Sequence, residues 1–348
     1  ATGFKGLFSQ DLKEKLQFTE VKNLPVQRAV TAFAQDPNGF IWFSTYGAGL
    51  YKYDGSTFTT YKESWKDEQS LSSSMVHAIY TDKDGDIWLG TEKGLNRYRP
   101  ETDDFENTSL IHTANEKPFA IHCIGSIDDK TLIVGSHNNG VYKVNKSTGE
   151  ITRIPFETPI KNDWLRFNSI EVLHSKIYLG TSFGLFEYNE QTGQIDRCEL
   201  LLNGARSRIP YHISKLCTDT SGNLWIGTYS HGLFRLDLDE KIYNYRELPI
   251  STKRILSIAE IDYGKMLVGT ENDGLFILNQ EGRLLDNYTN SKFGENLIHA
   301  DWKYVLAKRD RVRAVIITHG HEDHLGALPN LLNEMAVPVY APAYALAQ

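Results

Sequence analysis

Three histidines and one aspartate lie within six residues in the last part of the sequence. They follow the pattern His319-x-His321-x-Asp323-His324, and an apolar run, 312–317, leads directly into them. Imidazole nitrogens and carboxylate oxygens bind zinc at about 2.0–2.2 Å. A loop of this kind after a buried strand can direct several donors toward one point. The spacing therefore predicts a metal-binding loop.

The residues around this motif predict alternating helices and strands. Segment 301–309 has apolar side chains near helical spacing, and 325–332 also begins a helix. The runs 312–317 and 337–340 are typical of buried strands. We therefore expect residues 301–348 to form a short α/β fragment.

The motif and its surroundings, within 318–340, resemble the metallo-β-lactamase superfamily and ribonuclease J in particular. The resemblance implies that His319 and His321 bind one zinc ion and that Asp323 and His324 bind another, with a metal-bound hydroxide attacking a phosphodiester. The family also uses a later histidine, a bridging carboxylate and glycine-rich strands before the motif, for which this sequence offers no counterpart. We therefore predict an incomplete zinc site without hydrolase activity, and a metal-dependent hydrolase is the alternative function.

Most of the remaining sequence, from about 26 to 288, consists of six copies of one unit. Each copy contains an apolar strand that ends in Gly-Thr or a close variant, and a second Gly follows before an aliphatic residue. The six strands are 39–45, 85–91, 131–136, 176–181, 222–228 and 265–270. Their spacing of 42–47 residues, with turn signals between further apolar runs, predicts four strands per unit. This is the size of a propeller blade, so we predict an all-β, six-bladed β-propeller.

Three kinds of residue in the repeats are given structural roles. The glycines are expected in tight turns where φ is positive. Trp42, Trp88 and Trp225 recur in register, which favours a wedge between blades over a ligand platform. The three cysteines are expected to be small buried apolar residues rather than a disulfide framework. They are Cys123, Cys198 and Cys217.

The units 82–99 and 219–237 resemble the two-component regulator propeller repeat, and 17–55 resembles the customary opening of that family. The resemblance implies a periplasmic sensor of a hybrid two-component system, with seven blades as the family norm, an oligosaccharide ligand, no cofactor and the capacity to form a homodimer. No ligand contact carries over from the family. Trp65 and Trp164 lie between strands and are candidates for stacking on sugar rings, with ordinary loop packing as the alternative.

These features divide the sequence into four parts. An N-terminal segment, 1–25, contains a candidate ring-closing strand at 17–19; the propeller spans 26–288; a junction, 289–300, leads to the fragment 301–348. The change of character at the junction is interpreted as a chimera, from misassembled sequence or deliberate fusion, with a natural rearrangement as the alternative. Unrelated sequence then takes the place of a seventh blade.

Charge and hydropathy limit the partners. The net charge of −7 argues against a nucleic-acid partner unless the C-terminal fragment is functional. No run of 18 apolar residues exists, so no membrane span is predicted. The expected location is periplasmic, or cytoplasmic if the ribonuclease J-like fragment defines the protein. The leading function is a non-catalytic ligand sensor; a protein-interaction scaffold is a further alternative, because fold does not fix function.

Overall fold

The computed structural model describes most of the repeat region and two short stretches after it. The described residues are 29–108, 119–137, 139–156, 165–173, 176–198, 200–202, 205–207, 212–237, 241–244, 254–262, 264–288, 315–316 and 338–340. They form strands and turns without a helix, and none of them belongs to a helix that could cross a membrane. The chain divides into two compact units between Asn287 and Tyr288.

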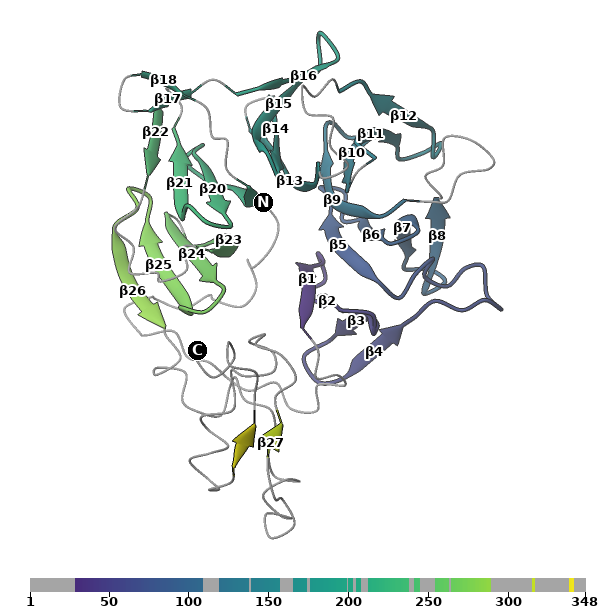
Figure 1. Ribbon diagram of the computed structural model, residues 1–348. Helices are drawn as coiled ribbons and strands as arrows, with labels where there is room; N and C mark the ends of the chain where they lie inside the picture. Colours follow the sequence, from purple (N-terminus) through teal and green to yellow (C-terminus); the bar gives the residue numbers. More distant parts are fainter. Residues whose placement is uncertain are drawn as a thin grey trace. The chain divides into compact units, whose positions relative to one another are not determined.

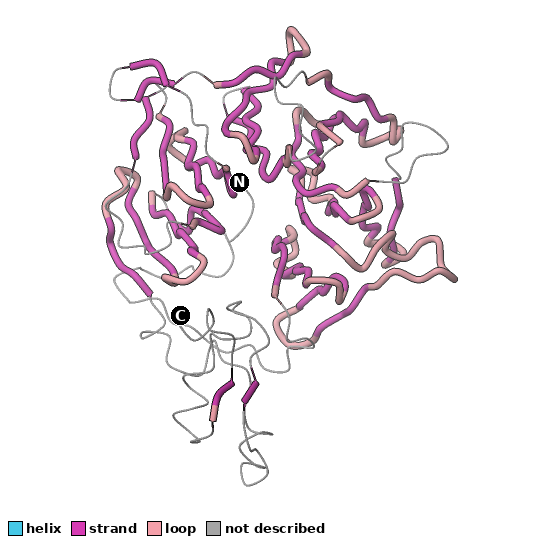
Figure 2. Tube along the Cα trace, in the orientation of Figure 1, coloured by secondary structure: helices cyan, strands magenta, loops and turns pink. Residues whose placement is uncertain are grey.

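The first unit contains six antiparallel sheets, one for each sequence repeat, which confirms the predicted six-bladed propeller (Figures 1 and 2). In each blade the strands follow one another in chain order. Blade 1 contains β1 (Val30–Gln35), β2 (Ile41–Thr45), β3 (Gly49–Tyr53) and β4 (Phe58–Tyr61). Blade 2 contains β5 (Val76–Thr81), β6 (Ile87–Thr91), β7 (Gly94–Arg99) and β8 (Asp104–Thr108). Blade 3 contains β9 (Ile121–Ser126), β10 (Thr131–Ser136), β11 (Val141–Asn145) and β12 (Ile151–Ile154).

Blades 4 to 6 repeat the same plan. Blade 4 contains β13 (Phe167–Leu173), β14 (Lys176–Thr181), β15 (Gly184–Asn189) and β16 (Gln194–Arg197). Blade 5 contains β19 (Ile213–Thr218), β20 (Leu224–Thr228), β21 (Leu233–Leu236) and β22 (Lys241–Asn244). Blade 6 contains β23 (Ile255–Asp262), β24 (Lys265–Thr270), β25 (Leu275–Asn279) and β26 (Leu284–Tyr288). Blade 5 is extended by a hairpin, because β17 (Leu200–Leu202) pairs with β18 (Ala205–Ser207) and lies parallel to β22. The sequence did not predict this hairpin.

The first strand of each blade is its innermost strand and contacts the first strand of the next blade. These contacts join β1 to β5, β5 to β9, β9 to β13, β13 to β19 and β19 to β23, and Figure 1 shows these strands on the inner side of their sheets. The blades therefore stack face against face around a common centre, which is the arrangement of a propeller.

The hydrophobic core lies between blades, and the wedge prediction is confirmed. Each of five buried clusters combines side chains of two neighbouring blades. Trp42, Trp88 and Trp225 are at most 4% exposed, and each packs into the cluster shared with the following blade. Ile133 and Tyr178 fill the same position in blades 3 and 4. Leu267, the equivalent residue of blade 6, is only partly buried.

The Asp-containing turn of the repeat supports the tryptophan. Asp82 Oδ1 accepts hydrogen bonds from the backbone N–H groups of Asp84 and Asp86, and its Oδ2 accepts one from the Trp88 indole at 3.1 Å. The same indole–carboxylate bond joins Trp42 to Asp36 and Trp225 to Asp219. The repeat therefore ties the turn between its first two strands to the wedge beside it. We call this side of a blade the turn edge.

The two glycines of each repeat have different functions. The second Gly has a positive φ, for example 120° at Gly94 and 119° at Gly184, as predicted for a tight turn. The first Gly is required by close packing instead, since a Cβ on Gly90 would lie 2.5 Å from the carbonyl oxygen of Ile121 in the next blade. The three cysteines are buried and form no disulfide with one another, as predicted.

The opposite side of each blade, where the innermost strand begins, carries a β-bulge. In blade 1 the register between β1 and β2 shifts between Val30 and Ala32, so Thr31 has no residue opposite it. All six blades have this shift at the second residue of the innermost strand. The six unpaired residues are Thr31, His77, His122, Asn168, Ser214 and Leu256. We call this side the entry edge.

The second unit is described at two short strands. β27 (Val315–Ile316) pairs in parallel with β28 (Val339–Tyr340). These strands lie within the runs 312–317 and 337–340 that predicted strands, and a parallel pair fits the expected α/β fragment. The predicted helices 301–309 and 325–332 and the candidate ring-closing strand 17–19 lie outside the described residues.

Candidate functional site

The predicted metal ligands do not fall in the described part of the chain. His319, His321, Asp323 and His324 all lie outside it, so the zinc site stays a prediction. Within the described residues, no three His, Cys, Asp or Glu side chains are arranged to hold a metal ion. The described candidates for a functional site all lie in the propeller.

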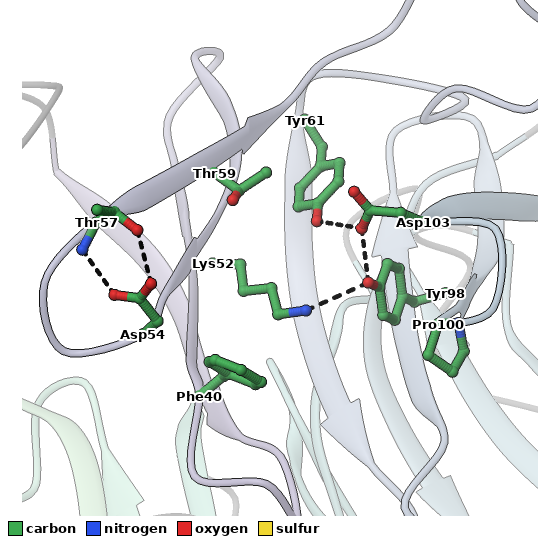
Figure 3. Close-up of a pocket in the computed structure, with 9 residues that line it drawn as sticks. All are labelled: Phe40, Lys52, Asp54, Thr57, Thr59, Tyr61, Tyr98, Pro100 and Asp103. Carbon is green, nitrogen blue, oxygen red and sulfur yellow. Dashed lines mark hydrogen bonds between the residues drawn. The ribbon is translucent and has the colours of Figure 1, made fainter.

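A pocket of about 350 Å³ opens on the outer strands of blades 1 and 2 (Figure 3). We call it the rim pocket. Its walls come from β3 and β4 of blade 1 and from β7 and the turn that follows it in blade 2. The lining residues are Phe40, Lys52, Asp54, Thr57, Thr59, Tyr61, Tyr98, Pro100 and Asp103. They combine three aromatic rings with a cation, two carboxylates and four hydroxyls, two of them on the tyrosine rings.

Asp103 organises one wall of the rim pocket. Its Oδ1 accepts hydrogen bonds from the Tyr61 hydroxyl at 2.6 Å and from the Tyr98 hydroxyl at 2.7 Å, and Lys52 Nζ donates to the Tyr98 oxygen at 3.3 Å. The backbone of Asp103 has a φ of 56°, the only positive φ of a non-glycine residue in the described part of the chain. Such a conformation is uncommon and concentrates at binding sites.

Three side chains that line the rim pocket have shifted pKa values. Burial, with the hydrogen bond to Asp103, raises the pKa of Tyr61, and burial likewise raises the pKa of Tyr98. On the opposite wall, hydrogen bonds from the Thr57 side chain and from the Thr57 and Ser56 backbone lower the pKa of Asp54. The tyrosines are therefore hydrogen-bond donors and Asp54 is an anionic acceptor.

The rim pocket places a cation against an aromatic wall. The Lys52 ammonium lies 4.5 Å from the centroid of the Phe40 ring and 5.1 Å from that of Trp42, which fixes its position over the aromatic wall. An amphipathic ligand with hydroxyl groups matches these walls.

Sequence reasoning did not predict any rim-pocket residue as a ligand contact. The residues lie in two repeats, and their side chains meet only because blades 1 and 2 are neighbours. The repeat alignment offers no signal for them, because Tyr53 and Tyr188 occupy the position of Tyr98 in other blades and Tyr245 and Tyr288 occupy that of Tyr61. Of the two aromatic candidates, Trp65 is 91% exposed and so is not packed in a loop, whereas Trp164 lies outside the described residues.

Two families match this sequence. The two component regulator propeller matches residues 23–47, 70–93 and 207–230, and the metallo-beta-lactamase superfamily matches residues 294–347. The propeller is therefore built from two-component regulator repeats, and the C-terminal segment is of metallo-β-lactamase type.

The relatives divide in the same way. Histidine kinase P4 of Formosa agariphila is 29% identical over 190 residues, which are 51% of this chain and 13% of that protein. Ribonuclease J 1 of Streptococcus pyogenes is 46% identical over 54 residues, which are 16% of this chain and 10% of that enzyme. The chain thus spans about a tenth of the length of the curated relatives it matches.

A solved structure aligns with the propeller. It is the extracellular domain of the hybrid two component system BT3049 from B. thetaiotaomicron, with a TM-score of 0.61 and 25% identity, and the alignment covers 76% of this chain and 36% of that domain. The repeat region is a propeller of the kind found in the extracellular domains of two-component sensors. None of these comparisons supports the cytoplasmic location.

Proposed function

We propose that the propeller is the ligand-binding part of a periplasmic hybrid two-component sensor, that its ligand is an oligosaccharide, and that it does not catalyse a reaction. The observation that carries the proposal is the rim pocket, in which aromatic rings and fixed donors and acceptors line one concave surface. Sugars present apolar C–H faces and a ring of hydroxyls, so they need both kinds of wall. The similarity to a histidine kinase and to sensor extracellular domains supports the same assignment.

The experiment is binding of a panel of neutral oligosaccharides, measured by calorimetry and thermal shift. We expect at least one member to bind and the variant Thr59→Trp to abolish its binding, because Thr59 lines the pocket from β4 and a Trp there fills it. The matched control is Thr60→Trp, since adjacent strand residues face opposite sides and Thr60 is also exposed. Binding that survives Thr59→Trp would refute the rim pocket as the site.

A second variant tests the Asp103 wall. Asp103→Gly retains a residue that tolerates positive φ and removes only the carboxylate. We expect the binding free energy to become less favourable by about 1–3 kcal/mol, because the Tyr61 and Tyr98 hydroxyls lose their shared acceptor and the pocket loses its shape. Unchanged affinity with unchanged stability would separate this carboxylate from ligand binding.

The second candidate function is zinc-dependent hydrolysis by His319, His321, Asp323 and His324. The observation that favours it is the 46% identity to ribonuclease J 1 around this motif, although the match covers 10% of that enzyme. Zinc content after purification, compared between the wild type and His319→Ala with His321→Ala, tests it. Two zinc equivalents together with phosphodiesterase activity would place the hydrolase above the sensor, and the absence of both would remove it.

A further inference from the structure

The entry edge of the propeller carries a row of basic and aromatic side chains that differ from blade to blade. We call this row the histidine belt. It spans blades 2 to 5, and its members are His77, His122, His137, Arg166, His212 and Tyr229. They come from three equivalent places: the bulged residue of the innermost strand, the residue before that strand, and the residue after the Gly-Thr position. All three places lie on the same edge because the innermost strand begins where the second strand ends.

The belt is connected by ring contacts. The His77 and His122 rings stack with centroids 4.3 Å apart and an interplanar angle of 22°. The His137 ring stacks on the other side of His122 at 12°. His137 is bridged through its backbone to Arg166 of blade 4, and further along His212 lies 4.3 Å from the Tyr229 ring.

Carboxylates close the two ends of the belt. Glu92 bonds to His77 Nε2 at 2.8 Å at one end. At the other end Arg254, whose guanidinium lies over the Tyr229 ring, forms an ion pair with Glu271. The middle of the belt differs, because no ion pair among the described residues includes Arg166. Its side chain is exposed, while its backbone is held by two hydrogen bonds to Ser182.

The histidines beside Arg166 are held neutral. Burial, together with the charges of its neighbours, lowers the pKa of His122 to about 3, and burial with the positive charge of Arg166 lowers that of His137 to about 4. The same two causes lower the pKa of His212. His122 Nδ1 and His212 Nε2 are shielded from solvent and have no hydrogen-bond partner within the described part of the chain.

The geometry of the belt favours an anion over a metal ion as its ligand. The nitrogen lone pairs of an imidazole lie in the plane of the ring, so rings stacked face to face cannot direct them at one ion. An exposed guanidinium that forms no ion pair with another described residue instead matches an oxyanion, which it binds with two parallel N–H donors. Neutral imidazole N–H groups add further donors, and the Tyr229 ring provides an apolar face.

We propose that the histidine belt is a binding site for the oxyanion group, carboxylate or sulfate, of an acidic saccharide, with Arg166 as its principal contact. The site lies at the entry edge near the innermost strands, whereas the rim pocket lies on the outer strands of blades 1 and 2. It goes beyond the proposed function, because a neutral saccharide in the rim pocket does not require it.

The experiment measures binding of three probes by calorimetry at low and high salt. The probes are trigalacturonate for the carboxylate, a heparin tetrasaccharide for the sulfate, and maltotriose as the neutral reference. We expect one of the acidic probes to bind, with an affinity that falls as salt increases. The variant Arg166→Gln should weaken that binding at least about tenfold, which corresponds to one charge-assisted hydrogen-bonded pair.

Two controls make the outcomes distinct. Arg283→Gln removes the same charge from an exposed turn of blade 6 and should leave binding unchanged. Thr59→Trp blocks the rim pocket and should leave binding of the acidic probe unchanged. Equal affinity of Arg166→Gln and wild type for both acidic probes would overturn the proposal, and so would a failure of both to bind. In either case neutral glycan binding that is lost in Thr59→Trp would still support the sensor function.

Discussion

The two edges of each blade come from the same repeat yet behave differently. At the turn edge, blades 1, 2 and 5 use one arrangement, an Asp carboxylate that bonds its own turn and the indole of the following Trp. At the entry edge the backbone repeats as a bulge in all six blades, whereas the side chains change from Thr to His, Asn, Ser and Leu. Residues that recur along the chain therefore stabilise the blade, and the residues that vary at a fixed backbone position are the candidates for binding.

The largest expected effect comes from the wedge. Trp225→Ala should destabilise the propeller by about 3–5 kcal/mol, because a fully buried aromatic side chain leaves a cavity between blades 5 and 6. Leu267→Ala changes the equivalent residue of blade 6, which is only partly buried, and should cost clearly less. Urea unfolding measures both. Equal losses would show that the wedge position has the same role in every blade.

Next in size is the turn edge of blade 2. Lys146 Nζ of blade 3 lies 2.6 Å from Asp82 Oδ2, and the Lys and Asp side chains are 8% and 0% exposed. Asp82→Ala breaks this buried pair and the Trp88 bond, and should cost about 3–5 kcal/mol. The double variant Asp82→Ala with Lys146→Met should recover part of the loss, because no buried charge is then left unpaired. A double variant no more stable than the single one would assign the loss to the hydrogen bonds from Trp88 and the turn rather than to the ion pair.

Acid provides a second measurement on the same carboxylate. Burial raises the pKa of Asp82, but the hydrogen bonds from Lys146 and Trp88 outweigh it and the folded-state pKa lies below its ordinary value. The stabilisation by Asp82 is therefore complete above the ordinary carboxyl pKa and is lost as the pH falls through the folded one. The stability difference between wild type and Asp82→Asn should narrow at acid pH. A stability difference that does not change with pH would contradict an ionised Asp82 in the folded protein.

A smaller effect is expected where blades approach each other. Gly90→Ala places a Cβ against the Ile121 carbonyl, and backbone atoms cannot move away as a side chain can, so the cost should be about 1–3 kcal/mol. Gly149→Ala has open space around its Cβ but a φ of 69°, so it reports the backbone strain alone. Unchanged stability of Gly90→Ala would show that close packing is not the reason for the first Gly.

The smallest effect is the pH response of the entry edge. An unfolded histidine takes up a proton below about pH 6.5, whereas His122 in the fold does so only near pH 3, so acidification favours unfolding between these values. His122→Phe should reduce the loss of stability between pH 7 and pH 5 by about 1 kcal/mol, a value that allows for partial exposure of the ring. Thermal unfolding at both pH values measures it, and parallel curves would contradict a neutral His122.

Sequence patterns predicted the blades well because each depends on local order. Alternating apolar residues, the Gly positions and the recurring Trp determine strands, turns and wedges within one repeat. The Asp82–Trp88 bond and the bulges were not predicted, since the first depends on the position of a side chain six residues away and the second on a register shift between strands. The binding sites were missed for a related reason: His77, His122 and Arg166 come from three repeats and meet only after the blades stack.

The exposure of Val30 in blade 1 also depends on how the blades stack and not on the repeat itself. Val30 of blade 1 is 38% exposed, whereas the equivalent Val76, Ile121 and Ile255 are fully buried. Each of those residues is covered by the blade before it. The repeat alone gives all of them the same environment, and only the order of the blades distinguishes Val30.

The bulge in every innermost strand has a consequence for how such a protein can diversify. A residue without a cross-strand partner can be exchanged without altering the ladder, so six positions on one edge can vary while the strand pairing stays the same. New specificities can then arise by point substitution on an unchanged scaffold, one blade at a time.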